Sequence, residues 1–311
     1  MPSQRASDWP WSISPSTTLW GRRVRQPRPC ARWLGRCWGK HSERKDEMNT
    51  TDTEMAVARD QYQRDGYCLT PPLIEAELLA RAIPRMEAVM REEYETGVPP
   101  RPSWKPGDSD TKIRKIDQVH LSDRTLFELV THPEVGRWAA QLTGARRIQV
   151  WAVQMLYKPP GGGEGGNIGW HQDRQYWRYW QEGSEVFTAW IAVGEVGTDS
   201  GPMNFVPGSH RWGLVGEGDF FGTDRAAQRD KVRVPVGETW SEAPALLAAG
   251  AASFHHCLTY HGSGPNLSAQ PRRSFALHLC TEKAQPIPGA QDYYISHLDD
   301  PVMCPVIYDE N

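Results

Sequence analysis

The chain has 311 residues with a formal net charge of −3, and its 28 glycines, 25 prolines and 14 tryptophans favour short strands and tight turns over a helical bundle. Its length allows one large domain or two modest ones. No apolar run approaches the roughly 20 residues that span a bilayer, and the six cysteines form no C-x-x-C pair, so we expect a cytoplasmic protein with reduced thiols and no membrane partner.

The first 48 residues differ in composition from the rest of the chain. They hold ten Lys or Arg and four Asp or Glu, which leaves 25 basic and 34 acidic residues and a net charge of −9 for the remainder. An acidic body argues against nucleic acid as a partner. The segment is rich in Arg and Ser, as a transit peptide is, but its prolines would break the amphipathic helix of such a peptide. We expect residues 1–53 to be a disordered or mis-started extension and residues 54–311 to form one domain.

The expected elements are helices first and strands afterwards. Apolar residues at three- and four-residue spacing predict helices over 54–70 and 73–96, with a short strand starting at "DGYCL" between them. One or two further helices are expected over 122–144, with Ser122 as the N-cap. Runs of β-branched and aromatic residues then predict strands over 146–159, 185–196, 201–210, 251–264 and 272–280. This order predicts a mainly β fold with N-terminal helices, built as an antiparallel barrel or double-sheet jelly roll.

The stretch "GWHQDRQYW", residues 169–177, holds a histidine and an aspartate two positions apart. In an extended chain, residues i and i+2 face the same side, so His171 and Asp173 would converge while Gln172 points away. The pair could be an acid/base pair, a buried hydrogen bond or two-thirds of a metal site. Deciding among these requires a third partner from elsewhere in the chain.

Two histidines and one carboxylate on one face of an ion form a common metal site with open positions. The later strands offer five histidines as the missing ligand: His210, His255, His256, His261 and His278. Among these, His255 and His256 are predicted to be strand or packing residues, because only one of two adjacent residues can face a site. His210 is predicted to anchor the "PGSH" turn.

His261 stands out because Arg272 follows it by eleven residues. A guanidinium offers two parallel donors to a carboxylate, which a lysine cannot match. A metal triad with an arginine nearby suits an α-keto acid that chelates iron and is held at its far carboxylate.

Three stretches carry a resemblance to a known family: "WHQD", "TAWIAVGEVGTDSGPMNFVPGSHRWG" and "FHHCLTYHGSGPNLSAQPRRSFALHL". Together they resemble the phytanoyl-CoA dioxygenase family over residues of about 58 to 282. Members are Fe(II)- and 2-oxoglutarate-dependent oxygenases on a double-stranded β-helix, a cupin-like jelly roll. The resemblance implies that His171, Asp173 and His261 hold Fe(2+), with 2-oxoglutarate and O2 as co-substrates. Relatives that halogenate have a small residue in place of Asp173, so its presence favours hydroxylation.

The resemblance also implies a 2-oxoglutarate pocket. Arg272 would pair with the 5-carboxylate of 2-oxoglutarate, and Ser263 in "HGS" would hydrogen-bond it. The neighbouring Arg273 could take the place of Arg272 if the register were shifted by one residue. Three more residues stand where the family lines this pocket: Gln154, Trp190 and Lys115.

Two other classes of protein remain open. One is a different cupin-type metal enzyme, an isomerase or hydrolase that uses the same ligands without 2-oxoglutarate. The other is a binding module whose site has lost activity. Arg272 favours the dioxygenase, which hydroxylates an unactivated C–H bond and releases succinate and CO2, because the other metal enzymes have no need of it. The expected partner is a small-molecule substrate, and the oligomeric state has no sequence signature.

Overall fold

The computed structural model describes residues 50–310. The extension predicted for residues 1–53 therefore lies outside the described residues, except at its end, where Thr50 already begins the first helix. The division of the chain at residue 54 stays a prediction. In the described part, no helix is long and apolar enough to cross a membrane.

The helices predicted in the N-terminal half are present. The α-helices are α1 (Thr50–Asp65), α2 (Ala76–Met90), α3 (Arg124–Val130), α4 (Pro133–Thr143) and, later in the chain, α5 (Arg225–Lys231). Short 3-10 helices are η1 (Val119–Leu121), η2 (Glu164–Gly166), η3 (Asp173–Gln175), η4 (Ser209–Trp212) and η5 (Ile295–His297).

Several helix boundaries differ from the sequence prediction: α1 spans Thr50–Asp65 where 54–70 was expected, and α2 begins at Ala76 where 73 was expected. The N-cap of α3 is Asp123, one residue after Ser122, because the Asp123 carboxylate accepts a hydrogen bond from the backbone N–H of Leu126 at 3.1 Å. Helix α2 ends at Met90, before the expected residue 96, and Glu92 just beyond it has a left-handed backbone with φ of 64°. That conformation stops helical hydrogen bonding.

Two antiparallel sheets form the β core. The major sheet has the order β1-β9-β6-β11-β4-β3-β2, with β12 also paired with β4. Its strands are β1 (Tyr67–Pro72), β2 (Arg101–Pro102), β3 (Arg114–Asp117), β4 (Arg147–Lys158), β6 (Val186–Ala192), β9 (Ala251–His256), β11 (Arg272–Thr281) and β12 (Val306–Asp309). The minor sheet has the order β5-β10-β7-β8, with strands β5 (Ile168–His171), β7 (Met203–Phe205), β8 (Ala243–Pro244) and β10 (His261–Ser263). The predicted fold class, a mainly β jelly roll with N-terminal helices, is confirmed.

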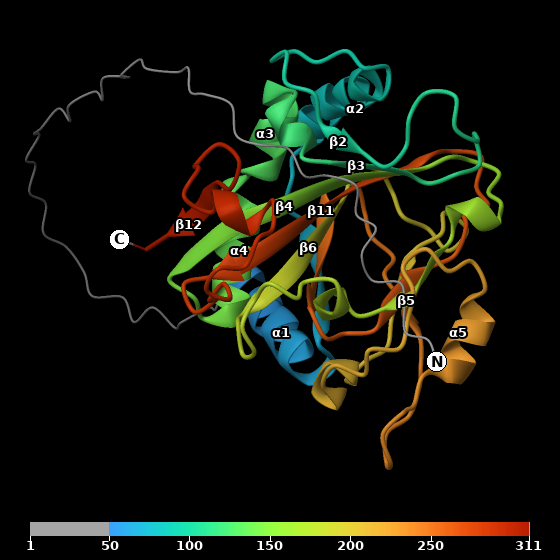
Figure 1. Ribbon diagram of the computed structural model, residues 1–311, viewed down its shortest axis with the longest axis vertical. Coiled ribbons are helices and arrows are strands. Elements are labelled where there is room, and N and C mark those ends of the chain that lie inside the picture. Colours follow the sequence, from blue (N-terminus) through green and yellow to red (C-terminus); the bar gives the residue numbers. More distant parts are fainter. Residues whose placement is uncertain (1–49, 311) are drawn as a thin grey trace, which may run out of the picture. The chain divides into compact units, whose positions relative to one another are not determined.

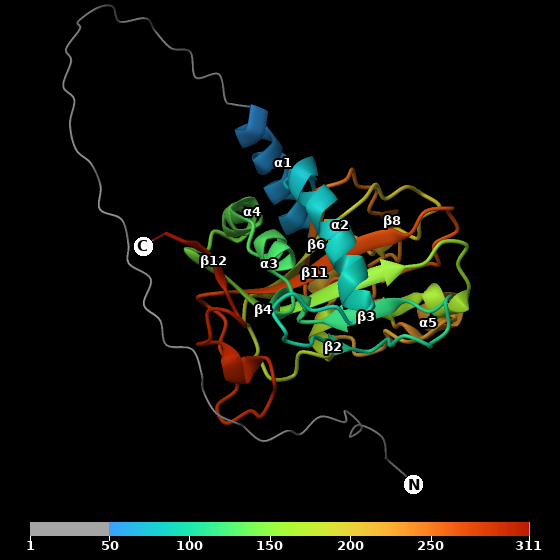
Figure 2. The ribbon, with the colours of Figure 1, turned by 90° about the horizontal axis from the view of Figure 1, so that it is seen from above.

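The two faces of the major sheet have different partners. Helices α1 to α4 lie on one side of the sheet, as Figure 2 shows, and its central strands β4, β11 and β6 run side by side in Figure 1. Phe275 and Leu277 on β11 point toward the helices and belong to the largest apolar core. Alternate residues of the same strand, Ala276 and His278, line a cavity on the opposite face. The strand alternation therefore separates a packing face from a cavity face.

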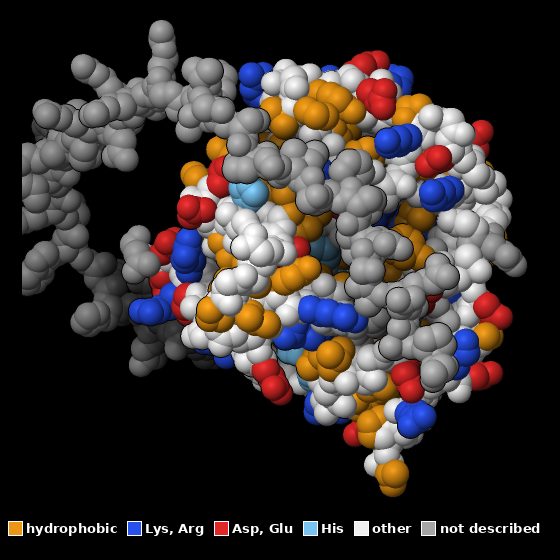
Figure 3. Space-filling view, viewed as in Figure 1, with side chains coloured by type: hydrophobic (Ala, Val, Ile, Leu, Met, Phe, Trp, Pro, Cys, Tyr) orange, Lys and Arg blue, Asp and Glu red, His pale blue; other side chains and the backbone are white. Residues whose placement is uncertain are grey.

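The outer surface carries both signs of charge. On the face shown in Figure 3, acidic and basic side chains are interspersed among polar and apolar ones.

Candidate active site

The H-x-D pair lies where β5 ends. His171 is the last residue of β5, and its register partner on the neighbouring strand β10 is His261. Gln172 is extended, with φ of −109° and ψ of 130°, and Asp173 opens η3. The Gln172 side chain points away from the pair, because its amide donates to the backbone oxygen of Leu258 at 2.7 Å. His171 and Asp173 therefore lie on one side of the chain, as extended geometry predicts.

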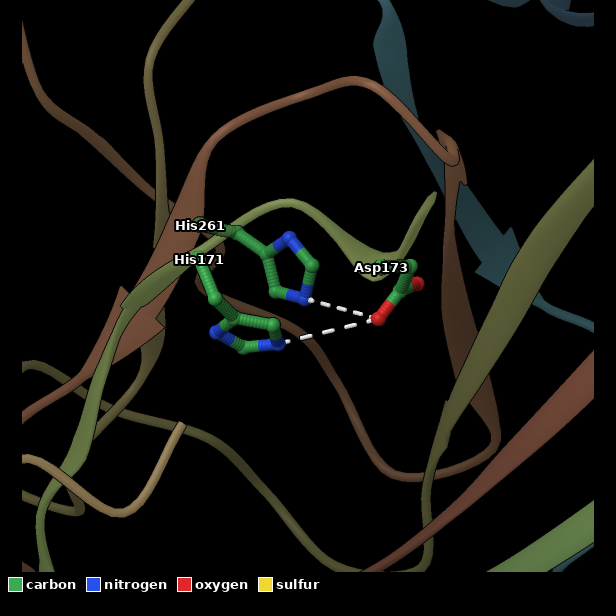
Figure 4. A group of neighbouring side chains, drawn as sticks. All are labelled: His171, Asp173 and His261. Carbon is green, nitrogen blue, oxygen red and sulfur yellow. Dashed lines mark ion pairs between the residues drawn. The ribbon is translucent and has the colours of Figure 1, made fainter. Parts of the chain in front are cut away.

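The three predicted metal ligands converge on one point (Figure 4). Nε2 of His171 lies 3.6 Å from Oδ1 of Asp173, and Nε2 of His261 lies 3.7 Å from the same oxygen. The ligand atoms of all three residues lie within 4.8 Å of one another. Metal–ligand bonds of about 2.1 Å let two ligands of one ion lie up to roughly 4 Å apart. One ion can thus bridge each histidine to the carboxylate, which is the arrangement of a 2-His-1-carboxylate iron site.

Backbone carbonyls orient both imidazoles. Nδ1 of His171 lies 2.9 Å from the oxygen of Gly169, and Nδ1 of His261 lies 3.0 Å from the oxygen of Thr259. Because a carbonyl only accepts hydrogen bonds, each Nδ1 carries the proton and each Nε2 presents its lone pair to the site. Burial holds the pKa of His261 well below its ordinary range. A neutral imidazole is the form that binds a metal.

The Asp173 carboxylate is held on its other oxygen. Thr188 donates from Oγ1 to Oδ2 of Asp173 at 2.8 Å, and Nε2 of His255 lies 3.3 Å from the same Oδ2. Burial opposes ionisation of Asp173, but the imidazoles of His261, His171 and His255 outweigh it and hold the pKa of this carboxyl well below its usual range. The carboxylate is therefore ionised, and Oδ1 remains for a metal ion.

Sequence reasoning assigned no role in this site to three polar residues of the cavity, His255, Thr188 and His278. His255 is a strand residue of β9, as predicted, but its side chain also lines the cavity beside Asp173. In the major sheet Thr188 pairs in register with both His255 and His278, so the three side chains form one row opposite Asp173. Nδ1 of His278 lies 3.0 Å from Oγ1 of Thr188. The signal for His255 was strand alternation, but alternation alone did not tell which of His255 and His256 faces the cavity.

The same cavity reaches Arg272. Arg272 is 3 % exposed, and in residues 50–310 its guanidinium makes one hydrogen bond, from Nη1 to the backbone oxygen of Gly201 at 2.7 Å. Its Nε and Nη2 are buried with no partner among the described residues, and its Cζ lies 5.0 Å from the centre of the Trp190 ring. Burial lowers the pKa of Arg272 to about 9, which leaves it charged at neutral pH. Buried donors of this kind require an acceptor.

The structure distinguishes Arg272 from its neighbour. Arg273 points to the other face of β11, where Nη2 lies 2.6 Å from Oε1 of Glu87 on α2. Arg272 is therefore the arginine that faces the cavity. The one-residue register shift that the sequence left open is not the arrangement seen.

The remaining pocket residues divide into two groups. Ser263, Gln154 and Trp190 line the cavity together with Arg272. Lys115 is not among the residues that line it, because its ammonium lies 2.6 Å from both carboxylate oxygens of Asp117 in a buried ion pair. The structure thus brings together every predicted site residue except Lys115.

Comparison with known proteins agrees with this geometry. The sequence profile of the family Phytanoyl-CoA dioxygenase (PhyH) matches residues 62–274. The chain belongs to this family of dioxygenases.

Two curated relatives and one solved structure illustrate the similarity. An ectoine dioxygenase from Bordetella parapertussis is 29 % identical over 240 residues, covering 70 % of this chain and 73 % of that protein. An L-proline trans-4-hydroxylase from Streptomyces griseoviridis is 24 % identical over 231 residues, covering 69 % and 82 %. The structure of SnoK, a non-haem alpha-ketoglutarate-dependent carbocyclase from nogalamycin biosynthesis, is 26 % identical with a TM-score of 0.62, covering 80 % of this chain and 95 % of SnoK. The predicted enzyme class, an Fe(II)- and 2-oxoglutarate-dependent dioxygenase, is confirmed.

Proposed function

We propose that this enzyme hydroxylates an unactivated C–H bond of a small organic substrate, converting 2-oxoglutarate and O2 to succinate and CO2. The supporting observation is that one cavity holds the His171, Asp173 and His261 triad at one end and the Arg272 guanidinium at the other, and that Nε and Nη2 of this guanidinium have no partner in residues 50–310. A triad of this kind leaves positions open on the metal for other ligands. An α-keto acid with a second carboxylate fits both ends of the cavity at once.

The donor set fits ferrous iron. Two neutral imidazoles and one ionised carboxylate suit a divalent first-row metal, and backbone hydrogen bonds to Nδ1 orient both rings. Iron bound here would supply, with 2-oxoglutarate and O2, the oxidising power for C–H hydroxylation.

The remaining side chains of the cavity would bind and orient the co-substrate and shield the reacting atoms from water. Arg272 would orient the co-substrate by its distal carboxylate through a bidentate contact. Ser263 would donate a hydrogen bond to the same carboxylate, and Gln154 and Trp190 would form the wall beside it. The buried surroundings keep bulk water from the reacting atoms. The roles of His171, Asp173 and His261 as catalytic metal ligands belong to the same proposal.

The alternative functions account for less of the site. An isomerase or hydrolase on the same triad has no use for an arginine with two buried, unpartnered nitrogens. An inactive binding module has no need of imidazoles that backbone carbonyls hold in the metal-binding tautomer. The similarity to an ectoine dioxygenase and to a proline hydroxylase supports hydroxylation, while SnoK is a carbocyclase, so the outcome at the substrate requires its own test.

Partners and location follow from the same proposal. We expect a small-molecule substrate, and neither nucleic acid nor a membrane as a partner. A cytoplasmic location agrees with ferrous iron and with the four described cysteines, all buried and free.

The direct test is co-substrate turnover. Purified protein would be reconstituted with Fe(II) without oxygen, then supplied with 2-oxoglutarate, O2 and a panel of amino acids, cyclic osmolytes and other small metabolites. We expect iron-dependent succinate formation, raised by the substrate that is hydroxylated, and a product heavier by one oxygen atom in mass spectrometry. Succinate formation that is independent of added iron, or absent with every substrate, contradicts the proposal.

A further inference from the structure

Lys158 is a second buried cation at the Arg272 end of the cavity. It is the last residue of β4, its register partner on β11 is Arg272, and it is 0 % exposed. Directly opposed residues on paired strands extend their side chains to the same face, so the ammonium and the guanidinium lie on one side of the sheet. Like charges in this position destabilise a sheet.

Within the described part of the chain, no carboxylate compensates these two charges. In residues 50–310, neither Lys158 nor Arg272 makes an ion pair. The ammonium of Lys158 instead donates to Oγ of Ser263 at 2.6 Å and to the backbone oxygen of Gly264 at 2.5 Å, both neutral acceptors. Burial, with the nearby charges of Arg272 and Arg225, holds the pKa of Lys158 well below its ordinary range. Buried cations are normally paired, so this end of the cavity has an unmet demand for negative charge.

Ser263 links Lys158 to the cavity. Ser263 lines the cavity, whereas Lys158 lies behind it. A hydroxyl that accepts a hydrogen bond from an ammonium keeps its own proton for another acceptor. Because Ser263 accepts from Lys158, its O–H is free to donate into the cavity beside Arg272. The contact also polarises that O–H.

We propose that Lys158 is a positioning residue for the distal carboxylate of the co-substrate, acting through Ser263 and through its charge. Together with Arg272 it makes the cavity select a keto acid that carries a second carboxylate over one that does not. This inference rests on the proposed 2-oxoglutarate-dependent function. It adds a residue that lies outside the cavity wall and that no sequence pattern singled out.

A different role for Lys158 would be purely structural. Its two hydrogen bonds tie the turn after β10 to the end of β4, and losing them would loosen the whole cavity. A loosened cavity would bind every keto acid less well. A lost charge would weaken only the ligand that carries the second carboxylate, and this difference allows a test.

The test compares two keto acids that share the chelating end. Wild type, Lys158→Gln and Lys158→Met are loaded with Mn(II) and titrated calorimetrically with 2-oxoglutarate and with 2-oxobutyrate, which has no distal carboxylate. We expect each substitution to weaken 2-oxoglutarate binding by about tenfold or more, the range for a lost hydrogen bond to a charged group. Binding of 2-oxobutyrate should change by less than about twofold. Gln keeps a hydrogen-bond donor for the backbone oxygen of Gly264, whereas Met does not. Whichever variant folds gives the ratio of its affinities for 2-oxoglutarate and 2-oxobutyrate.

Arg273→Gln is the matched control, because this neighbouring cation faces α2 and should change neither affinity. An equal loss for both keto acids in the Lys158 variants would assign Lys158 a structural role and overturn the inference, as would unchanged binding of both. If wild type loaded with Mn(II) bound neither keto acid, the proposed function itself would fail, and that result is distinct from a failure confined to the variants.

Discussion

The two ends of the cavity carry opposite charge. At the metal end, the ionised Asp173 is surrounded by the imidazoles of His171, His255 and His261. At the other end, Lys158 and Arg272 lie opposite each other, and neither pairs with a carboxylate in residues 50–310. The negative charge at the metal end therefore suits a cationic ligand, and the positive charge at the Arg272 end suits an anionic one. A protein that keeps such charges buried gives up stability for binding.

The largest effect is expected from a substitution that removes the negative charge at the metal end of the cavity. Asp173→Ala should reduce iron-dependent succinate formation by at least about 100-fold, because it deletes a metal ligand and the negative charge that favours the ion. Mn(II) should also raise the melting temperature of wild type and not that of the variant. The exposed Asp230 provides a control, since Asp230→Ala should behave as wild type. Iron-dependent turnover that survives Asp173→Ala intact would remove this residue from the site.

The next effect concerns the opposite end. Arg272→Leu should weaken 2-oxoglutarate binding by roughly 100-fold, the range for loss of a buried partner of a charged group, and leave Mn(II) affinity nearly unchanged. Arg273→Leu should leave both affinities as in wild type, because Arg273 pairs with Glu87 outside the cavity. Calorimetric titration of the two variants checks this pair directly. Equal losses in both would show that the two arginines are not distinguished by the face they occupy.

A smaller effect on metal affinity is expected from Thr188, which contacts Asp173 on the side away from the metal. Thr188→Val removes the hydroxyl that donates to Oδ2 of Asp173 at 2.8 Å while keeping the side-chain shape. Metal affinity should fall by about tenfold, as is usual when a hydrogen bond that orients a ligand is lost. Titration with Co(II), followed by visible absorption, measures it. The melting temperature of the metal-free protein should stay close to that of wild type, and a large drop would instead indicate a role in packing.

The smallest effect tests whether the two ends act separately. Without metal, 2-oxoglutarate should raise the melting temperature by no more than about 2 °C, through its contacts with the cationic end alone. Metal and 2-oxoglutarate together should raise it by more than the sum of the two single effects, because the chelating end of the keto acid then binds as well. Strictly additive shifts would mean that the two ligands do not meet in one cavity.

Several features were predictable because they depend on short stretches of chain. The spacing of His171 and Asp173 places them on one side of any extended segment, and strand-forming composition predicted the two-sheet core. The eleven-residue spacing from His261 to Arg272 singled out the third ligand, and the resemblance to the family gave both residues their roles, because no local pattern could join them to the first pair. Helix boundaries were less predictable. The N-cap of α3 is Asp123 and not the adjacent Ser122, because both residues can cap a helix and they lie side by side in the chain.

The sequence by itself determined which residue types are present and how they alternate along each strand. Only the tertiary structure decided which alternate set faces the cavity, since a shift of one residue exchanges the two faces. That choice put Arg272 and His255 inside the cavity, and turned Arg273 toward the helices. Pairing between distant strands also placed Lys158 opposite Arg272, and Thr188 between His255 and His278. These positions depend on register among strands far apart in the chain, which is set by the packing of the whole sheet rather than by any one segment.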